Sequence, residues 1–198
     1  FDLGTYSRPV TTNSSEAQRW FDRGLIWSYG FHHEESIRCF KKAAEFDTDC
    51  AMAYWCIAYA GGPNYNKPWE MFDEADMEQS CRESCAAANK AHSLLHATSP
   101  AERALIEAIR HRYPSKTPTD EFNVWNDNYA NAMRTVYELF SDDLDVCTLF
   151  SDALMNCTPW ALWDLQNGEP AKGANTMEAM DVLNGAIAQM EKSDSERH

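Results

Sequence analysis

Apolar residues recur at intervals of three and four along most of the chain, which is the spacing of one face of an α-helix. The pattern predicts eight main helices and no strand. The helices are expected at about 14–30, 32–46, 50–60, 73–96, 99–113, 120–140, 144–157 and from 175 onward. Paired in chain order, they predict an all-α fold of four antiparallel hairpins, preceded by a polar lead-in over residues 1–13.

Local signals mark where several of these helices begin and end. Ser99-Pro-Ala-Glu102 combines a capping serine, a proline and a glutamate at the positions of a capping box. Gly61-Gly-Pro63 ends the third helix and opens a long loop over 61–70, where a tight turn would suffice. Pro159–Trp163 is expected to form a short helical turn, and 166–174 a loop. Because long loops inside an array of helices often carry function, the 61–70 loop is a candidate binding segment.

Large and small residues alternate in a fixed order between residues 17 and 58. The marks in the first pair of helices are Trp20, Gly24 and Trp27, then Ser36, Phe40 and Ala43, and the next pair opens with Tyr54, Ile57 and Ala58. This order resembles the tetratricopeptide repeat (TPR) family, clearly over 17–58 and more loosely over 70–198. The resemblance implies a TPR-like right-handed superhelix over 14–198, with a concave groove that binds a partner.

By that resemblance, five aromatic or apolar side chains would face the groove: Phe21, Leu25, Tyr29, Trp55 and Tyr59. The groove has none of the Lys, Arg and Asn with which such repeats clamp a carboxylate. The expected partner is therefore an apolar peptide, a small apolar ligand or another segment of the same polypeptide. Asn64, Tyr65 and Asn66 of the long loop could add contacts. The alternative is that the aromatic residues are core between helices.

Histidines next to carboxylates offer a different function. His33 with Glu34 or Glu35 could act as an acid–base pair or bind a divalent metal, although the same residues also suit the start of a helix. His92 and His96 lie four residues apart and could form a metal pair. The second hypothesis is therefore an enzyme, or part of one, with a His/Glu site near the first hairpin and the 61–70 loop. No organic cofactor is predicted.

Composition narrows the choice of partner and compartment. With 31 acidic and 17 basic residues the formal charge is −14, which opposes binding to nucleic acid. No apolar run approaches the roughly 20 residues that span a membrane. Seven cysteines without a C-x-x-C pair predict reduced, buried thiols and a cytoplasmic protein. Because the chain begins without methionine and ends directly after a helix, we expect it to be one portion of a longer polypeptide. The sequence leaves open whether the protein forms an oligomer.

Overall fold

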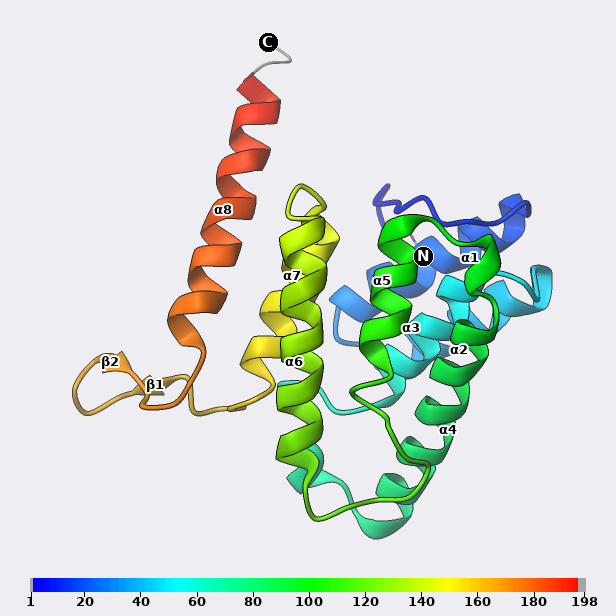
Figure 1. The fold of residues 1–198 in the computed structure, drawn as a ribbon. Coiled ribbons are helices and arrows are strands. Elements are labelled where there is room, and N and C mark those ends of the chain that lie inside the picture. The colour runs from blue at the N-terminus through cyan, green and yellow to red at the C-terminus, as the bar shows by residue number, and fades with distance from the viewer. Residues whose placement is uncertain (1, 196–198) are drawn as a thin grey trace. The chain divides into compact units, whose positions relative to one another are not determined.

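The computed structural model describes residues 2–195 and is mostly helical. Its eight α-helices are α1 (Ser15–Tyr29), α2 (His33–Phe46), α3 (Ala51–Gly61), α4 (Glu74–Ser93), α5 (Pro100–Ile109), α6 (Phe122–Leu139), α7 (Leu144–Met155) and α8 (Thr176–Ser195) (Figure 1). The all-α prediction is confirmed at this level. No helix of the described residues is both long enough and apolar enough to cross a membrane.

Polar side chains fix the first turns of several helices. Ser14 accepts a hydrogen bond from the Ala17 amide at α1, and Asp73 accepts one from the Asp76 amide at α4. The predicted capping box at α5 is present, with Ser99 and Glu102 each accepting from the other's backbone N–H. Such caps satisfy backbone amides that have no partner within the helix, so they set where each helix begins.

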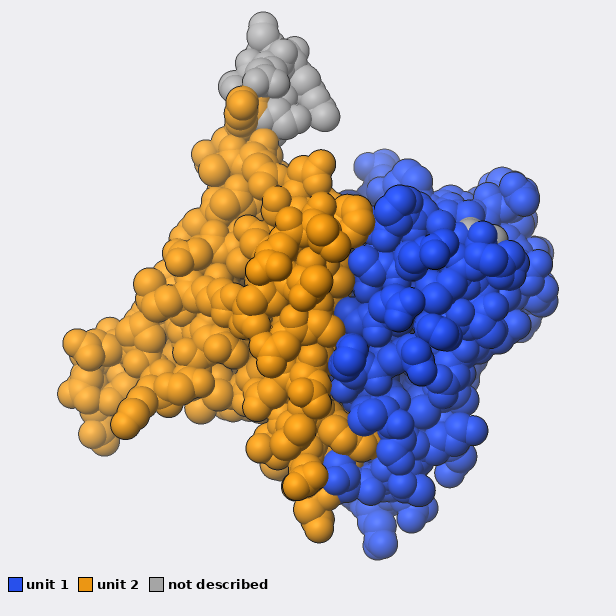
Figure 2. All heavy atoms as spheres, in the orientation of Figure 1, with its two compact units in different colours: residues 1–62, 73–119 blue, residues 63–72, 120–198 orange. Residues whose placement is uncertain are grey.

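The described chain divides into two compact units (Figure 2), a division that the sequence pattern does not indicate. Unit 1 comprises residues 1–62 and 73–119, and therefore holds α1 to α5. Unit 2 comprises residues 63–72 and 120–198, and holds α6 to α8 together with most of the long loop. The loop between α3 and α4 thus leaves unit 1 and belongs to the core of unit 2.

In unit 1 successive helices pack side by side: α2 contacts α1 and α3, α4 contacts α3, and α5 contacts α3 and α4. Gly24 lets α2 approach α1, because an added Cβ would lie only 2.6 Å from Cε1 of Phe40. Ser36 of α2 donates a buried hydrogen bond of 2.7 Å to the Gly24 carbonyl. Small and large residues read from the sequence as packing marks therefore do meet at the first helix pair.

The polar lead-in is fixed onto unit 1 by hydrogen bonds. Gln18 accepts from the Val10 amide and donates to the Arg8 carbonyl, at 3.0 and 2.8 Å. Further along, the amide and hydroxyl of Thr11 both donate to the carboxylate of Glu102, a residue only 4% exposed. The capping glutamate of α5 therefore also anchors a segment 91 residues earlier in the chain.

Unit 2 is built on α6, α7 and α8, with α7 packed against both of the others. The loop residue Trp69 is 2% exposed and stacks on Phe122 with ring centroids 4.2 Å apart. Trp125 lies edge-on to both rings. Aromatic stacking of this kind buries large apolar surfaces, so it accounts for the loop joining this unit.

Two predicted local structures are wrong. Residues 159–163 do not form a helical turn: Trp160 has a positive φ of 60°, and a short antiparallel ladder pairs β1 (Trp163–Asp164) with β2 (Glu169–Pro170). The Asp164 carboxylate accepts from the amides of the turn, which closes the hairpin without a helix. The fourth helix ends at Ser93, and Leu95–Ala97 is a separate 3₁₀ turn.

Candidate functional site

A pocket of about 540 Å³ opens on one face of the first helix pair in unit 1. Its lining is aromatic, cationic and partly apolar. The lining residues are Leu3, Trp20, Arg23, Trp27, His32, Glu35, Arg38 and Cys39. A volume of this size is typical of pockets that hold small organic ligands.

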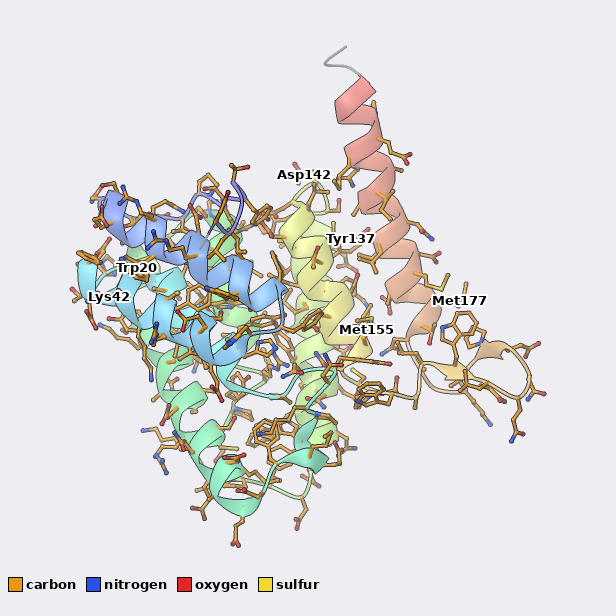
Figure 3. All side chains as sticks on the ribbon, turned by 180° about the vertical axis from the view of Figure 1, so that it is seen from behind. Trp20, Lys42, Tyr137, Asp142, Met155 and Met177 are labelled. Carbon is orange, nitrogen blue, oxygen red and sulfur yellow. The ribbon has the colours of Figure 1, made fainter. Side chains whose placement is uncertain are left out.

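The first helix supplies the aromatic side of the pocket. Trp20, Arg23 and Trp27 are three and four residues apart, so they project from one face of α1 (Trp20 is labelled in Figure 3). The guanidinium carbon of Arg23 lies 4.8 Å from the centre of the Trp20 ring, within the range of a cation–π contact. Both tryptophans are half-buried, which leaves part of each ring open to a ligand.

The turn between α1 and α2 brings His32 into the pocket. The Phe31 amide donates to the Ser28 carbonyl and the His32 amide to the Trp27 carbonyl, which is the Schellman pattern that ends many helices. Phe31 takes the left-handed position at φ 62°, where glycine is usual. As a result the His32 ring lies edge-on against Trp27, with centroids 5.3 Å apart. Its Nδ1 accepts from the Glu35 amide at 3.4 Å, so His32 also caps α2.

The second helix supplies charge and a buried thiol. Glu35 forms an ion pair with Arg38 at 3.0 Å, and the Cys39 sulfur lies 4.0 Å from the same carboxylate. Burial, and secondarily the Glu35 charge, raises the pKa of the Cys39 thiol above its ordinary value of 9.0. Cys39 therefore stays protonated near neutral pH, which is the opposite of what a nucleophilic cysteine needs.

The pocket carries a local charge unlike that of the whole chain. Two guanidinium groups face one carboxylate in a protein whose formal charge is −14. Glu35 already pairs with Arg38, whereas Arg23 forms no ion pair with any carboxylate of the described residues. The site can thus offer a flat ring surface and a guanidinium to one ligand. A second pocket of about 320 Å³, lined partly by the lead-in, shares Leu3 and Arg23 with it.

Comparisons with protein-family models, with curated proteins and with solved structures find no match to this chain. The residues of the pocket are therefore the basis on which a function can be inferred.

Two of the three predicted acid–base candidates lie outside the lining of this pocket. His33 is the half-buried first residue of α2, and Glu34 beside it is exposed. Glu35 does line the pocket, where it is held by Arg38. The histidine that joins it there is His32, one residue before the predicted one.

The proposed pair of metal-binding histidines does not share a helix. His92 is in the last turn of α4, with its Nε2 4.0 Å from Glu107, whereas His96 is exposed in the 3₁₀ turn that follows. Within residues 2–195, no three His, Cys, Asp or Glu side chains gather in a way that could hold a metal ion.

Most of the expected groove residues lie inside unit 1. Phe21, Leu25 and Trp55 are 1%, 6% and 2% exposed, and therefore offer a ligand almost no surface. Phe21 packs against the ring of Phe40, and Trp55 donates a hydrogen bond to the Leu105 carbonyl of α5 at 2.8 Å. The other two are half-buried: Tyr29 contacts the ring of Tyr6, and Tyr59 stacks on Trp55.

The three loop candidates form a tight turn in unit 2. Asn64 pairs with Lys67 through two backbone hydrogen bonds, and its side chain accepts from the Asn66 amide. Tyr65 at the turn lies against Trp160, with ring centroids 5.4 Å apart. The turn therefore presents an aromatic pair that belongs to the second unit.

Sequence reasoning missed the residues that matter most to the pocket. Trp20 and Trp27 read as internal packing marks, and neither Arg23 nor His32 was singled out. One signal was present: Trp20, Arg23 and Trp27 recur on one helical face with a charge between two aromatic residues. A purely internal stripe would not place an arginine there.

Proposed function

We propose that this protein is a binding module made of helical hairpins of the TPR type, and that it binds a small planar anion in the Trp20–Trp27 pocket. The observation that carries the proposal is Arg23, an exposed guanidinium that lies over an aromatic ring, lines a pocket of about 540 Å³ and has no ion pair among the described residues. An aromatic carboxylate would lie against the indole rings and place its charge on Arg23.

The packing of unit 1 supports the hairpin part of the proposal. Consecutive helices contact each other in chain order from α1 to α4, as stacked hairpins do. The close contact at Gly24 and Phe40 falls on the small and large marks by which the chain resembles TPR proteins. All seven cysteines are free thiols, so a reducing compartment such as the cytoplasm is the proposed location.

Catalysis has less support than binding. The acid–base candidate His33 and the pocket carboxylate Glu35 belong to different surroundings, and Glu35 is already engaged by Arg38. The buried thiol in the pocket has a raised pKa, which disfavours a nucleophilic role.

Calorimetry with two related probes tests the proposal. Naphthalene-2-carboxylate carries the ring and the charge, and naphthalene-2-methanol carries the ring alone. We expect the carboxylate to bind up to about fivefold more tightly, since an ion pair with an exposed arginine contributes about 0.2–1 kcal/mol. Arg23→Gln should abolish this difference, and Trp27→Ala should weaken both probes.

Matched substitutions elsewhere serve as controls. Trp163→Ala removes a 42% exposed tryptophan of unit 2, and Arg110→Gln removes an exposed arginine of unit 1. Neither should change the affinity for naphthalene-2-carboxylate. If Arg23→Gln and Trp27→Ala bind both probes as the unmodified protein does, the pocket is not the binding site.

A further inference from the structure

The last helix carries two apolar seams, of which only one is covered. The buried residues Ala179, Val182 and Ala186 lie along the first seam, and α8 packs against α7. The second seam consists of Met180, Leu183, Ile187 and Met190, which we call the α8 stripe. Met180, Leu183 and Ile187 each follow a buried residue by one position. The stripe therefore lies about 100° around the helix from the covered seam.

The stripe is exposed along its length. Met180, Ile187 and Met190 are 39%, 53% and 52% exposed, and Leu183 is half-buried. Met177, in the first turn of the helix (Figure 3), adds a further apolar side chain that is 52% exposed. Isolated exposed apolar residues are ordinary, but a continuous row on one helix indicates an interaction surface.

The spacing of the stripe identifies the shape of its partner. Its members are three, four and three residues apart, which is the seam that one helix presents to another. Three of the five large apolar side chains at 177–190 that are exposed or half-exposed are methionines, whose flexible thioethers adapt to different helical faces. A single amphipathic helix with apolar residues at the same spacing therefore fits the surface.

The charge of unit 2 identifies the chemistry of that partner. This unit holds 16 acidic and 5 basic residues, a formal charge of −11, whereas unit 1 holds 15 acidic and 12 basic residues, a charge of −3. The helix itself carries four acidic residues and one lysine. Asp142 adds an exposed acid next to Ser141, whose carbonyl accepts a hydrogen bond from Gln189 of α8. A second copy of so acidic a unit would be repelled.

We infer that the α8 stripe is a docking surface for a basic amphipathic helix of another protein. The apolar face of the partner covers Met180, Leu183, Ile187 and Met190, and its lysines and arginines lie toward the acidic surface of unit 2. The α8 stripe shares no residue with the Trp20–Trp27 pocket, so either proposal can fail without the other.

A model peptide tests the inference on the whole chain. The probe is a fluorescein-labelled 18-residue helix with leucines at three- and four-residue spacing and lysines elsewhere, and binding is followed by fluorescence anisotropy. We expect the double variant Ile187→Gln/Met190→Gln to weaken binding at least tenfold. Met71→Gln is the control, because Met71 is a 61% exposed methionine of the same unit outside the stripe, and it should change binding less than twofold.

Two further peptides separate the apolar and electrostatic parts. Replacing every lysine by glutamate should reduce binding at least tenfold, and shuffling the leucines out of helical register should do the same. Failure of the lysine peptide to bind overturns the inference, and so does equal binding by the shuffled peptide or an equal loss in Met71→Gln. Sedimentation that shows a dimer dissociated by Ile187→Gln/Met190→Gln would assign the stripe to a second copy instead.

Discussion

A Cβ atom on Gly24 would lie 2.6 Å from Cε1 of Phe40, whereas a Cβ on Gly185 would have no atom within 4 Å. Both glycines lie inside helices, where a glycine loses more conformational entropy on folding than an alanine would. The first lets two helices approach closely, and the second has open space around it. One substitution at the two positions should therefore have opposite effects on stability.

We predict that Gly24→Ala lowers the free energy of unfolding by about 1–3 kcal/mol, because Phe40 must leave its position in a packed core. Gly185→Ala should raise it by about 0.5–1 kcal/mol through helix propensity alone. Urea unfolding followed by circular dichroism measures both values. An unchanged stability in Gly24→Ala would show that the helix contact relaxes freely, and would remove the packing basis of the repeat resemblance.

Single residues also explain why the candidate site was only partly predictable. Sequence rules would assign the left-handed conformation at the end of α1 to Gly30. In the structure Phe31 adopts this conformation instead. That shift by one position aims His32 rather than His33 at Trp27. Sequence spacing cannot reveal it, because the choice depends on which residue best tolerates a strained backbone against its surroundings.

At the scale of elements, helices were predictable where local signals dominate. Apolar periodicity located all eight, and the Ser99–Glu102 capping box was read correctly. The hairpin at 163–170 was not recognised, since two-residue strands leave no alternating pattern. The contact of the lead-in with α5 could not be predicted either. Thr11 and Glu102 are 91 positions apart in the sequence, and hydrophobic periodicity carries no information on contacts between such distant residues.

One ion pair connects two helices of unit 2 and can be tested by pH. Arg134 of α6 forms a bidentate pair with Glu178 of α8, at 2.6 and 2.8 Å. Hydrogen bonding to Arg134 lowers the pKa of Glu178 below its ordinary value of 4.5. Because the folded state lowers this pKa, the pair stabilises the fold above pH 4.5 and loses its effect as the pH falls through the folded-state value.

We predict that Glu178→Gln lowers the free energy of unfolding by about 0.5–1 kcal/mol at pH 7, a range suited to a pair about one-third exposed. The difference from the unmodified protein should shrink as the pH falls below 4.5 and vanish below the folded-state pKa of Glu178, where the carboxylate is protonated in both states. Glu16→Gln removes the more exposed pair with Arg19 and should have a smaller effect at pH 7. A difference that persists at low pH would assign the loss to packing.

At the scale of the whole molecule, charge is divided unevenly between the units. Unit 2 carries −11 of the total of −14, although it is the smaller of the two. Like charges in one folded unit repel each other and favour its expansion, and added salt screens the repulsion. Residues 63–72, when released from unit 2, lengthen the loop between α3 and α4, and a longer loop adds only a small entropic cost to the folding of unit 1.

We therefore predict that unit 2 unfolds before unit 1 in urea at low salt. Buried thiols report on each unit: Cys147 on unit 2, and Cys50 and Cys81, whose pKa values burial raises to about 11, on unit 1. In pulsed alkylation read by mass spectrometry, Cys147 should become reactive at a lower urea concentration than the other two. Added sodium chloride should move the Cys147 midpoint upward by more than theirs. Simultaneous exposure of all three thiols at every salt concentration would show that the two units unfold as one.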